Sequence, residues 1–271
     1  MPDELRVTLN FHPDVSVGGL AMIEALARDG VYRSQFETGT SNGGLTAHAG
    51  GDRWMWESRL FGGAYDDADI ALRPKYGALN HRGDPVGGSR RFGSCHLRLK
   101  PAVLARTTFC YPDSHMDPGQ FGVAGRMALI ALADANLSGL EPLDDYVEAH
   151  VHGTVSIAED VEAVVLDPSY RATAVETVAS RLGCTIAWHE GFGLSRDRLD
   201  GCAAYRGTAA AQAIADLGEY GMVTPARIGV ARRHGLDRQL AKWIWHCVAR
   251  FGGRWNDPQK STATPLRSQS P

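Results

Sequence analysis

The chain has 271 residues, 44% hydrophobic and 22% charged, which is the composition of an ordinary globular protein with room for a sizeable core. Its formal net charge of −3 gives no general electrostatic case for nucleic-acid binding, which usually requires a basic face. No run of about 18 apolar residues is present, so neither a membrane-spanning helix nor a membrane partner is expected.

The cysteines indicate a reducing compartment. The five of them are widely spaced and none forms a CxxC pair, which argues against a disulfide framework and against a zinc knuckle. The opening MPDELRVTLNF lacks the basic and apolar regions of a signal peptide. We therefore expect a cytoplasmic protein, although export without a signal, as for some bacterial toxins, would leave no mark in the sequence.

The first half of the chain predicts several strands and two helices. A strand is expected over 5–11 and a helix over 18–30, whose apolar side chains recur at helical intervals and which ends at Gly30. Further strands are predicted over 75–81, 93–100 and 103–111, and a helix over 126–138. Between them, 30–65 is rich in glycine and polar residues and predicts irregular structure, which at that length is more often functional than idle.

The second half begins with two predicted strands and then becomes mainly helical. The strands are 144–155 and the apolar run 161–167; helices are expected over 172–183, 208–218 and 237–252, with a strand inside 184–194. We expect a core over 1–168, a mostly helical extension packed on it over 169–255, and a disordered tail over 256–271.

The stretch DDYVEAHVHGTV concentrates chemistry on one face of its strand. Alternation places Tyr146, Glu148, His150 and His152 on one side and apolar residues on the other. Neighbours at i and i+2 lie about 6.6 Å apart, so two of them can share a metal ion if a third ligand arrives from elsewhere. The spacing of the other histidines fixes no such ligand, and the polar half of an ordinary half-exposed strand fits the same pattern.

Two further segments have the residue types of a ligand site. YRSQFETGTSNGG concentrates donors that can hold ribose hydroxyls or a pyrophosphate, or that simply decorate a surface loop. RPKYG places Arg73 and Tyr76 at the start of a strand, which suits an anionic ligand with a planar ring, or equally a packed ring beside a surface arginine. Neither a GxSxG turn nor a Walker loop is present, and no cysteine has a nucleophile signature.

The order of these motifs carries two resemblances. The succession TLNFHPD, YRSQFETGTSNGG, RPKYGALN, RFGSCHLRL, RTTFCYPDS and YVEAHVHG closely resembles an uncharacterised bacterial family known only as a domain of unknown function, over roughly residues 6–252. The order of these segments and their residue types also resemble the ADP-ribosyltransferase superfamily. YVEAHVHGTVSIAEDVEAVVL is similar to the late segment of DarT-like enzymes, in which a catalytic glutamate opens a strand.

The second resemblance implies a fold and a set of roles. The fold is α+β, with an ADP-ribosyltransferase-like split β-sheet core and a helical C-terminal extension. Glu148 would bind the ribose 2′-hydroxyl of NAD and orient or deprotonate the acceptor, His12 would hold the ribose or the nicotinamide amide, and Tyr76 would stack on the nicotinamide ring. The other expected NAD contacts are Arg33, Ser34, Gln35, Thr40, Ser41, Asn42 and Arg73.

Two departures leave the subclass open. His12 stands in FHPD instead of the plain H-x-T of many relatives, and TSN replaces the STS of the arginine-first class. The partner of Glu148 is therefore either His12 or Arg6.

The resulting expectation is NAD-dependent ADP-ribosyl transfer to an unknown acceptor, which is a protein, a nucleic acid or a small molecule. NAD is the substrate and no metal is expected. Three alternatives stay open: an NAD glycohydrolase at the same site, a metal-dependent hydrolase that uses Glu148, His150 and His152, and a non-enzymatic binding module.

Overall fold

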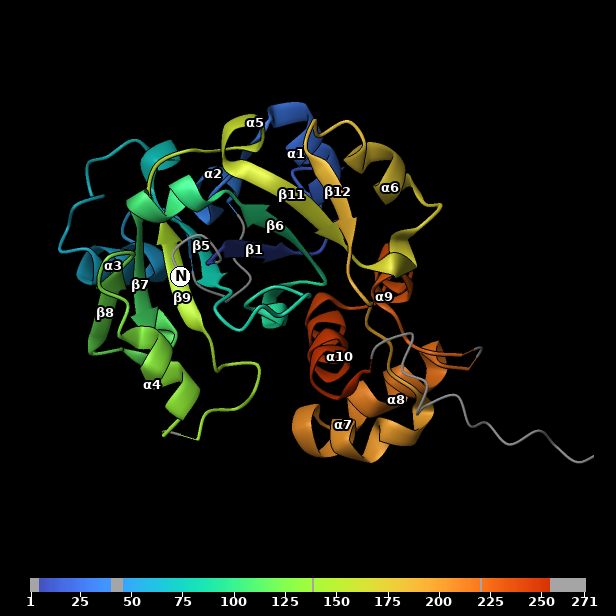
Figure 1. Cartoon of the computed structure of the whole chain (residues 1–271). Coiled ribbons are helices and arrows are strands. Elements are labelled where there is room, and N and C mark those ends of the chain that lie inside the picture. Colours follow the sequence, from blue (N-terminus) through green and yellow to red (C-terminus); the bar gives the residue numbers. More distant parts are fainter. Residues whose placement is uncertain (1–4, 40–45, 138, 220, 254–271) are drawn as a thin grey trace, which may run out of the picture.

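A computed structural model describes residues 5–39, 46–137, 139–219 and 221–253, and a large mixed sheet organises them (Figure 1). Its strands are β1 (Val7–Phe11), β5 (Lys75–Leu79), β6 (Cys95–Leu99), β7 (Thr107–Tyr111), β8 (Gln120–Val123), β9 (Val147–Val151), β11 (Val161–Leu166) and β12 (Thr185–Trp188). They lie in the order β12-β11-β6-β1-β5-β9-β7-β8. All neighbours are antiparallel except β11 and β12, which are parallel.

Two short ribbons and ten α-helices accompany the sheet in the described part of the chain. The ribbons pair β2 (Ser16–Val17) with β3 (Leu20–Ala21) and β4 (Val31–Tyr32) with β10 (Val155–Ser156). The helices are α1 (Met22–Asp29), α2 (Gln35–Thr38), α3 (Asp52–Leu60), α4 (Leu129–Ala135), α5 (Ile157–Asp160), α6 (Ala174–Ala179), α7 (Leu199–Arg206), α8 (Thr208–Leu217), α9 (Pro225–Arg233) and α10 (Arg238–Phe251).

The structure confirms the strands and helices expected from periodicity, except that 103–106, expected as the start of a strand, belong to a 3-10 helix (Pro101–Arg106) that precedes β7. Helix α1 ends as predicted, because Gly30 adopts the left-handed conformation with φ of 66°. Helix α10 begins where the side chain of Asp237 accepts the backbone N–H of Leu240. The expectation of irregular structure over 30–65 is wrong in part, because Asp52–Leu60 form α3. At the start of this helix the Asp52 N–H donates to the Thr46 hydroxyl. The glycines on both sides of this segment hid the helix.

One face of the sheet is apolar and carries the main core. Leu9, Leu97, Phe109, Ala149 and Val164 are fully buried on it. Helices α1, α4 and α6 supply the other half of this core, with Ile23, Leu26, Leu129, Ala133, Val175 and Val178. Burial of this apolar surface is the main force that holds the sheet and these helices together.

The opposite face is polar, and the strand register aligns its side chains in rows. Thr8 pairs with Ala78, Ala78 with Glu148, and Glu148 with Cys110, so these four side chains point to one side of the sheet. In the next row Tyr76 pairs with His150, and His150 with Thr108. The predicted polar face of β9 therefore extends across its neighbours.

The hydrogen-bonded ladder between β1 and β5 is short. Their ladder consists of two pairs, Val7 with Leu79 and Thr8 with Ala78, whereas the β5–β9 ladder runs over five. Beyond Thr8 the next inward side chain, Asn10, donates instead to the carbonyls of Val86 and Gly93 in the loop between β5 and β6. The backbone of this loop approaches β1 so closely that there is no room for a side chain at Gly93: an added Cβ would lie 2.2 Å from the carbonyl carbon of Phe11.

Helices α7 to α10 pack on one another around a second apolar cluster, which includes Ile214, Ile244, Trp245 and Val248 (Figure 1). The sheet itself continues past residue 168, because β12 pairs with β11. The division into a core over 1–168 and an extension over 169–255 stays a prediction, and the expected tail over 256–271 lies outside the described residues. Among the described residues, no helix is both long enough and apolar enough to cross a bilayer.

A buried histidine of α10 predicts how stability depends on pH. Burial, and then the charges of Arg206 and Arg91, lower the pKa of His246 to about 3. The unfolded chain therefore takes up this proton near pH 6.5 and the folded chain does not, so His246 costs stability as the pH falls between these values.

His246→Gln removes this contribution. Relative to the variant, we expect wild type to lose up to about 1.4 kcal/mol of unfolding free energy per pH unit below 6.5. Urea unfolding of both proteins at pH 7.5, 6.5 and 5.5 measures the difference. Identical pH slopes for the two would contradict the assignment.

Candidate functional site

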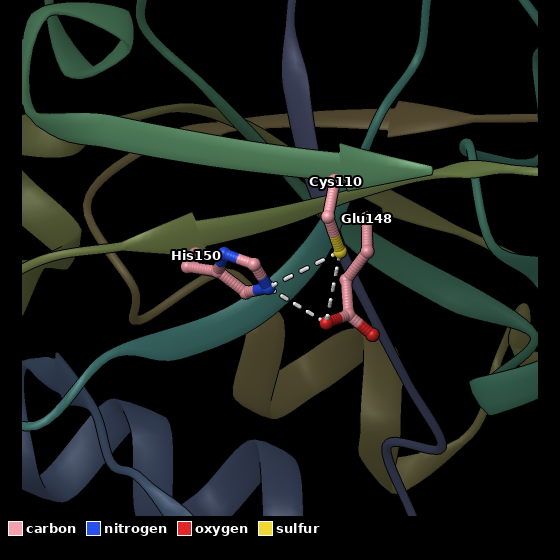
Figure 2. A group of neighbouring side chains, drawn as sticks. All are labelled: Cys110, Glu148 and His150. Atoms are coloured by element: carbon pink, nitrogen blue, oxygen red, sulfur yellow. Dashed lines mark hydrogen bonds and ion pairs between the residues drawn. The ribbon is translucent and has the colours of Figure 1, made fainter. Parts of the chain in front are cut away.

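The polar face of the sheet brings Glu148, His150 and Cys110 together (Figure 2). Glu148 and His150 come from β9, and Cys110 comes from β7 directly opposite Glu148. The His150 Nε2 lies 2.7 Å from the Glu148 Oε1, and the Cys110 Sγ lies 4.0 Å from that oxygen and 3.8 Å from the His150 Nε2. All three residues are buried. Because their ligand atoms lie within 4.8 Å of one another, they are also the set that could hold a metal ion.

The carboxylate of Glu148 uses its two oxygens differently. Oε1 contacts His150 and Cys110 and also accepts a hydrogen bond from the Ser114 hydroxyl. Figure 2 shows Oε2 turned away from the other two side chains, and the carboxyl group of Asp113 also interacts with the Glu148 carboxylate. Burial alone would raise the pKa of Glu148, but the bond and charge of His150, the Ser114 bond and the charge of Arg53 lower it below its usual value. Glu148 is therefore an ionised carboxylate at neutral pH, and its Oε2 faces away from His150 and Cys110.

A hydrogen-bonded chain leads from Glu148 to a half-buried tyrosine. The His150 Nδ1 lies 3.2 Å from the Thr108 hydroxyl, which lies 2.9 Å from the His152 Nε2. The His152 Nδ1 then bonds the Tyr65 hydroxyl. If His150 donates to Glu148, then Thr108 donates to His150, His152 to Thr108, and Tyr65 to His152. Because the hydroxyls of Thr108 and Tyr65 can also accept hydrogen bonds, each of the bonds among these four side chains can have the opposite direction. Burial, and then His150 and Arg106, lower the pKa of His152, so its ring is neutral at pH 7.

A planar cation lies on the ring of Tyr76. The Arg53 guanidinium carbon is 4.4 Å from the ring centre of Tyr76 and 4.4 Å from that of Trp56. The Arg53 Nε is buried and has no hydrogen-bond partner within the described ranges. The other edge of the Tyr76 ring meets His150, at 5.3 Å between ring centres. Tyr76 and Glu148 thus define a place where a planar cation is held by a π face and a nearby carboxylate.

Some of the predicted NAD contacts gather in a small cavity beside Tyr76. Arg33, Ser34, Gln35 and Tyr76 line it, together with Arg53, Lys75 and their neighbours, around a volume of about 50 Å³. Ser34 accepts the backbone N–H of Glu37 and so begins α2, while Arg33 pairs with Asp29. The remaining residues of the predicted loop, Thr40, Ser41 and Asn42, lie outside the described residues.

Arg73 is placed differently from the prediction. It is 2% exposed, and its guanidinium donates to Glu57 at 2.6 Å and to the Tyr65 carbonyl at 2.8 Å. Glu57 is fully buried and accepts a second bond, at 2.9 Å, from the Tyr76 hydroxyl. This geometry does not favour phosphate binding by Arg73. It gives the residue a structural role, since the Arg73–Glu57 pair fixes the position of Tyr76 and attaches α3 to the sheet.

His12 is not brought to Glu148. His12 lies four residues beyond Thr8 in the chain, and Thr8 is in the same cross-strand row as Glu148, two strands away. At about 3.3 Å per residue and 4.8 Å per strand, the Cα atoms of His12 and Glu148 are therefore roughly 16 Å apart. Its ring packs edge-on against Trp245 of α10, at 4.8 Å, and its Nδ1 lies 3.4 Å from the Ser94 hydroxyl. Burial, and then Arg232, lower its pKa to about 3. The alternative partner, Arg6, pairs with Glu162 of β11 on the other side of β1.

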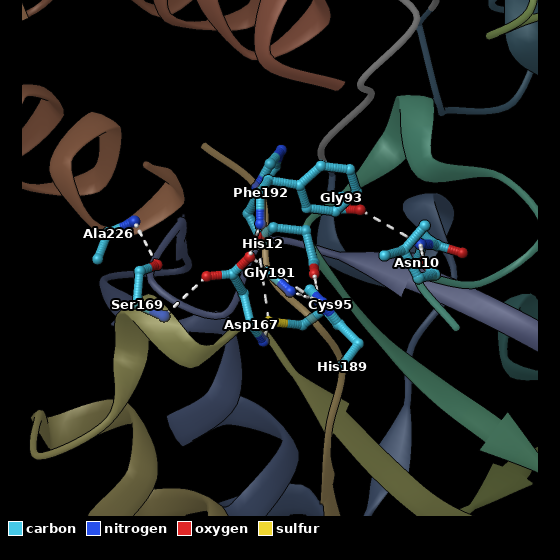
Figure 3. Close-up of polar contacts among 12 residues, drawn as sticks. Asn10, His12, Gly93, Cys95, Asp167, Ser169, His189, Gly191, Phe192 and Ala226 are labelled. Carbon is cyan, nitrogen blue, oxygen red and sulfur yellow. Dashed lines mark hydrogen bonds and ion pairs between the residues drawn. The ribbon is translucent and has the colours of Figure 1, made fainter. Parts of the chain in front are cut away.

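The surroundings of His12 form the joint between the sheet and the C-terminal helices (Figure 3). Asp167, at the end of β11, accepts the backbone N–H groups of Ser169 and Phe192. His189 lies between two backbone groups, since its Nε2 is 2.7 Å from the Ser94 carbonyl and its Nδ1 accepts the Gly191 N–H. With both ring nitrogens occupied by backbone, His189 acts as a structural residue.

Sequence reasoning missed Cys110, Ser114, Arg53 and Glu57. Cys110 joins the site through cross-strand pairing, which the alternation within one strand cannot reveal. Ser114 follows Asp113 in the turn after β7, and the other two lie on α3. The motif RTTFCYPDS already placed Cys110 on the polar side of a strand, and that was the one available signal.

The chain belongs to the family described as protein of unknown function (DUF3626), which it matches over residues 6–138 and 126–251. Comparison with curated proteins finds no match. The expected resemblance to an uncharacterised family is confirmed, whereas the comparisons show no link to ADP-ribosyltransferases.

The buried pair of Arg73 and Glu57 predicts a large loss of stability when it is broken. Arg73→Met leaves the carboxylate of Glu57 buried without its cation, which should cost about 3 kcal/mol or more in unfolding free energy. Arg98→Met is the matched control, because Arg98 pairs with Glu162 at a half-exposed site and should cost less than about 1 kcal/mol. Urea unfolding measures both, and equal losses would contradict the structural role of Arg73.

Proposed function

We propose that this protein cleaves the nicotinamide–ribose bond of NAD and transfers ADP-ribose to an acceptor. The observation that carries the proposal is the proximity of the ionised Glu148 carboxylate, whose Oε2 faces away from His150 and Cys110, to a Tyr76 ring that already holds a planar cation. The nicotinamide ring of NAD is itself a planar cation, attached to a ribose with a hydroxyl beside the bond that breaks.

The arrangement of the sheet supports the same reading. The strands that carry the first-strand motif, Tyr76 and Glu148 are β1, β5 and β9, which are consecutive neighbours. The β1–β5 ladder is short and ends before Tyr76, which agrees with the split sheet that the ADP-ribosyltransferase resemblance implies. The resemblance seen in the order of motifs thus agrees with which strands are adjacent.

The chemistry follows from the position of Glu148. With nicotinamide stacked on Tyr76, Oε2 would accept a hydrogen bond from the ribose 2′-hydroxyl. As the C1′–N1 bond breaks, its electron pair passes to the ring nitrogen, nicotinamide leaves as a neutral molecule, and positive charge develops on the ribose. The Glu148 charge stabilises that state more than the ground state. The acceptor then bonds to C1′, and Glu148 takes its proton.

The histidines hold the carboxylate in place. His150 donates to Oε1 and so orients Oε2, and Thr108, His152 and Tyr65 continue the hydrogen-bonded chain that holds the His150 ring. His12 and Arg73 contribute through the fold, whereas Arg33, Ser34 and Gln35 lie where they can contact the remainder of the dinucleotide.

Glu148→Gln should abolish the reaction. The amide keeps the size of the side chain but loses the charge and the proton acceptor, so nicotinamide release from NAD should fall by about 100-fold or more. The assay is chromatographic detection of nicotinamide with purified protein, with and without cell lysate as the source of acceptor. Glu159→Gln, at an exposed position of α5, should retain full activity.

Release that needs lysate supports transfer, and steady release without lysate supports hydrolysis by the same site. If wild type neither binds nor cleaves NAD with lysate present, the proposal fails.

Arg53 should compete with nicotinamide for the ring of Tyr76. The cavity of about 50 Å³ is too small for a dinucleotide, so NAD must displace the guanidinium. In a Glu148→Gln background, where NAD is not consumed, Arg53→Met should lower the Kd for NAD several-fold, as measured by calorimetry. Arg171→Met removes a comparable cation from Trp188 at the far edge of the sheet and should leave the Kd unchanged. Weaker binding after Arg53→Met would contradict this placement of nicotinamide.

A further inference from the structure

Cys110 takes no part in the proposed reaction, yet it completes a set of three different ligand types. The sequence offered Glu148, His150 and His152 as metal ligands on one strand and no third element to close the site. The structure removes His152 from that set, because its Nε2 bonds Thr108, and introduces Cys110 from β7. Thiolate, imidazole and carboxylate are the ligands that zinc-type ions prefer, whereas magnesium and calcium require oxygen.

We propose that Cys110, Glu148 and His150 bind one divalent ion of the zinc type, and that this ion switches off the reaction at Glu148. The metal site stands on the geometry alone. The inhibition rests on the proposed function.

The separations are close to those around tetrahedral zinc. Bonds of about 2.0 Å to nitrogen and oxygen and 2.3 Å to sulfur put the ligand atoms roughly 3.3 to 3.5 Å apart. The Cys110 Sγ is 3.8 Å from the His150 Nε2 and 4.0 Å from the Glu148 Oε1, while that nitrogen and oxygen are 2.7 Å apart. Shifts of about half an ångström in these separations would give the tetrahedral arrangement. A water or the Ser114 hydroxyl, which already bonds Oε1, would occupy the fourth coordination position.

The hydrogen bonds behind His150 can adapt to the ion. A metal on Nε2 requires the ring proton on Nδ1, where it would donate to the Thr108 hydroxyl. That hydroxyl would then donate to the His152 Nε2, and the His152 Nδ1 to Tyr65, so that each bond keeps its partners and reverses its direction. The ion also displaces the thiol proton of Cys110, which leaves to solvent.

Occupation of this site opposes NAD directly. The ion binds the oxygen next to the one that the ribose hydroxyl needs. It also adds a net charge of +1 where a cationic ring must approach Tyr76, because loss of the thiol proton offsets one of the two charges of the ion. In the free protein the charge of Glu148 adds to the attraction of the Tyr76 ring for that cation. Zinc and NAD therefore compete for one group.

Cobalt(II) tests the metal site without any enzymatic assay. Titration of the full chain, after chelator treatment and long incubation, should give one bound equivalent and a thiolate-to-cobalt charge-transfer band. Cys110→Ser should abolish the band and weaken binding roughly tenfold or more. Cys184→Ser, which alters a half-buried thiol near the opposite edge of the sheet, should leave both unchanged. No bound cobalt in wild type, or a band that persists in Cys110→Ser, overturns the site.

Two further measurements complete the experiment. If Cys110→Ser does not fold, His150→Asn replaces it and should likewise lose the bound equivalent; retention overturns the site. Zinc should inhibit nicotinamide release by wild type and by Cys184→Ser, but not by Cys110→Ser. If zinc does not inhibit the wild type, the inhibition is overturned and the metal site is not. If no NAD cleavage is detected, the proposed function is contradicted, and the cobalt titration still decides whether the metal site exists.

Discussion

The ionised carboxylate of Glu148 in the interior is the constraint on which the rest of the site depends. An isolated buried carboxylate is costly in free energy, so it persists only where hydrogen bonds and opposite charge compensate for lost water. Here Oε1 is contacted by His150 from the same strand, Cys110 from the next and Ser114 from the turn beyond. The carboxyl group of Asp113 also interacts with Glu148. Oε2 faces away from His150 and Cys110, so in the proposed reaction the group is a binding site as well as a stabilised charge.

The segment over the polar face is held by a second buried charge. Glu57 of α3 binds Arg73 and the Tyr76 hydroxyl, and Arg73 in turn binds the Tyr65 carbonyl. This pair attaches α3 and the turn after it to β5, and it thereby positions Arg53 over Tyr76 and Tyr65 beside His152. The two buried carboxylates, about one strand apart, thus have different roles. Glu148 is the reactive carboxylate, and Glu57 with Arg73 fixes the aromatic and cationic groups around it.

Much of the fold could be predicted from the sequence, because local periodicity reports which face of an element is apolar. The strands at 5–11, 75–81 and 144–155 and the helix at 237–252 were predictable in this way, and so was the shared face of Glu148 and His150. The neighbours of a strand could not be predicted, since register depends on contacts between distant segments. For that reason Cys110 was missed and His12 was expected beside Glu148. Arg73 was expected to meet a ligand because its partner, Glu57, lies on α3, a helix that the glycine-rich segment did not predict.

The central claim is that Glu148 and Tyr76 bind the nicotinamide riboside end of NAD. A crystal structure of the Glu148→Gln variant with NAD tests it most directly, because the variant should bind the substrate and not consume it. The account predicts the nicotinamide ring on Tyr76, with Arg53 displaced, and the ribose 2′-hydroxyl within hydrogen-bond distance of side chain 148. NAD bound elsewhere, or bound here with Arg53 still on Tyr76, would contradict it.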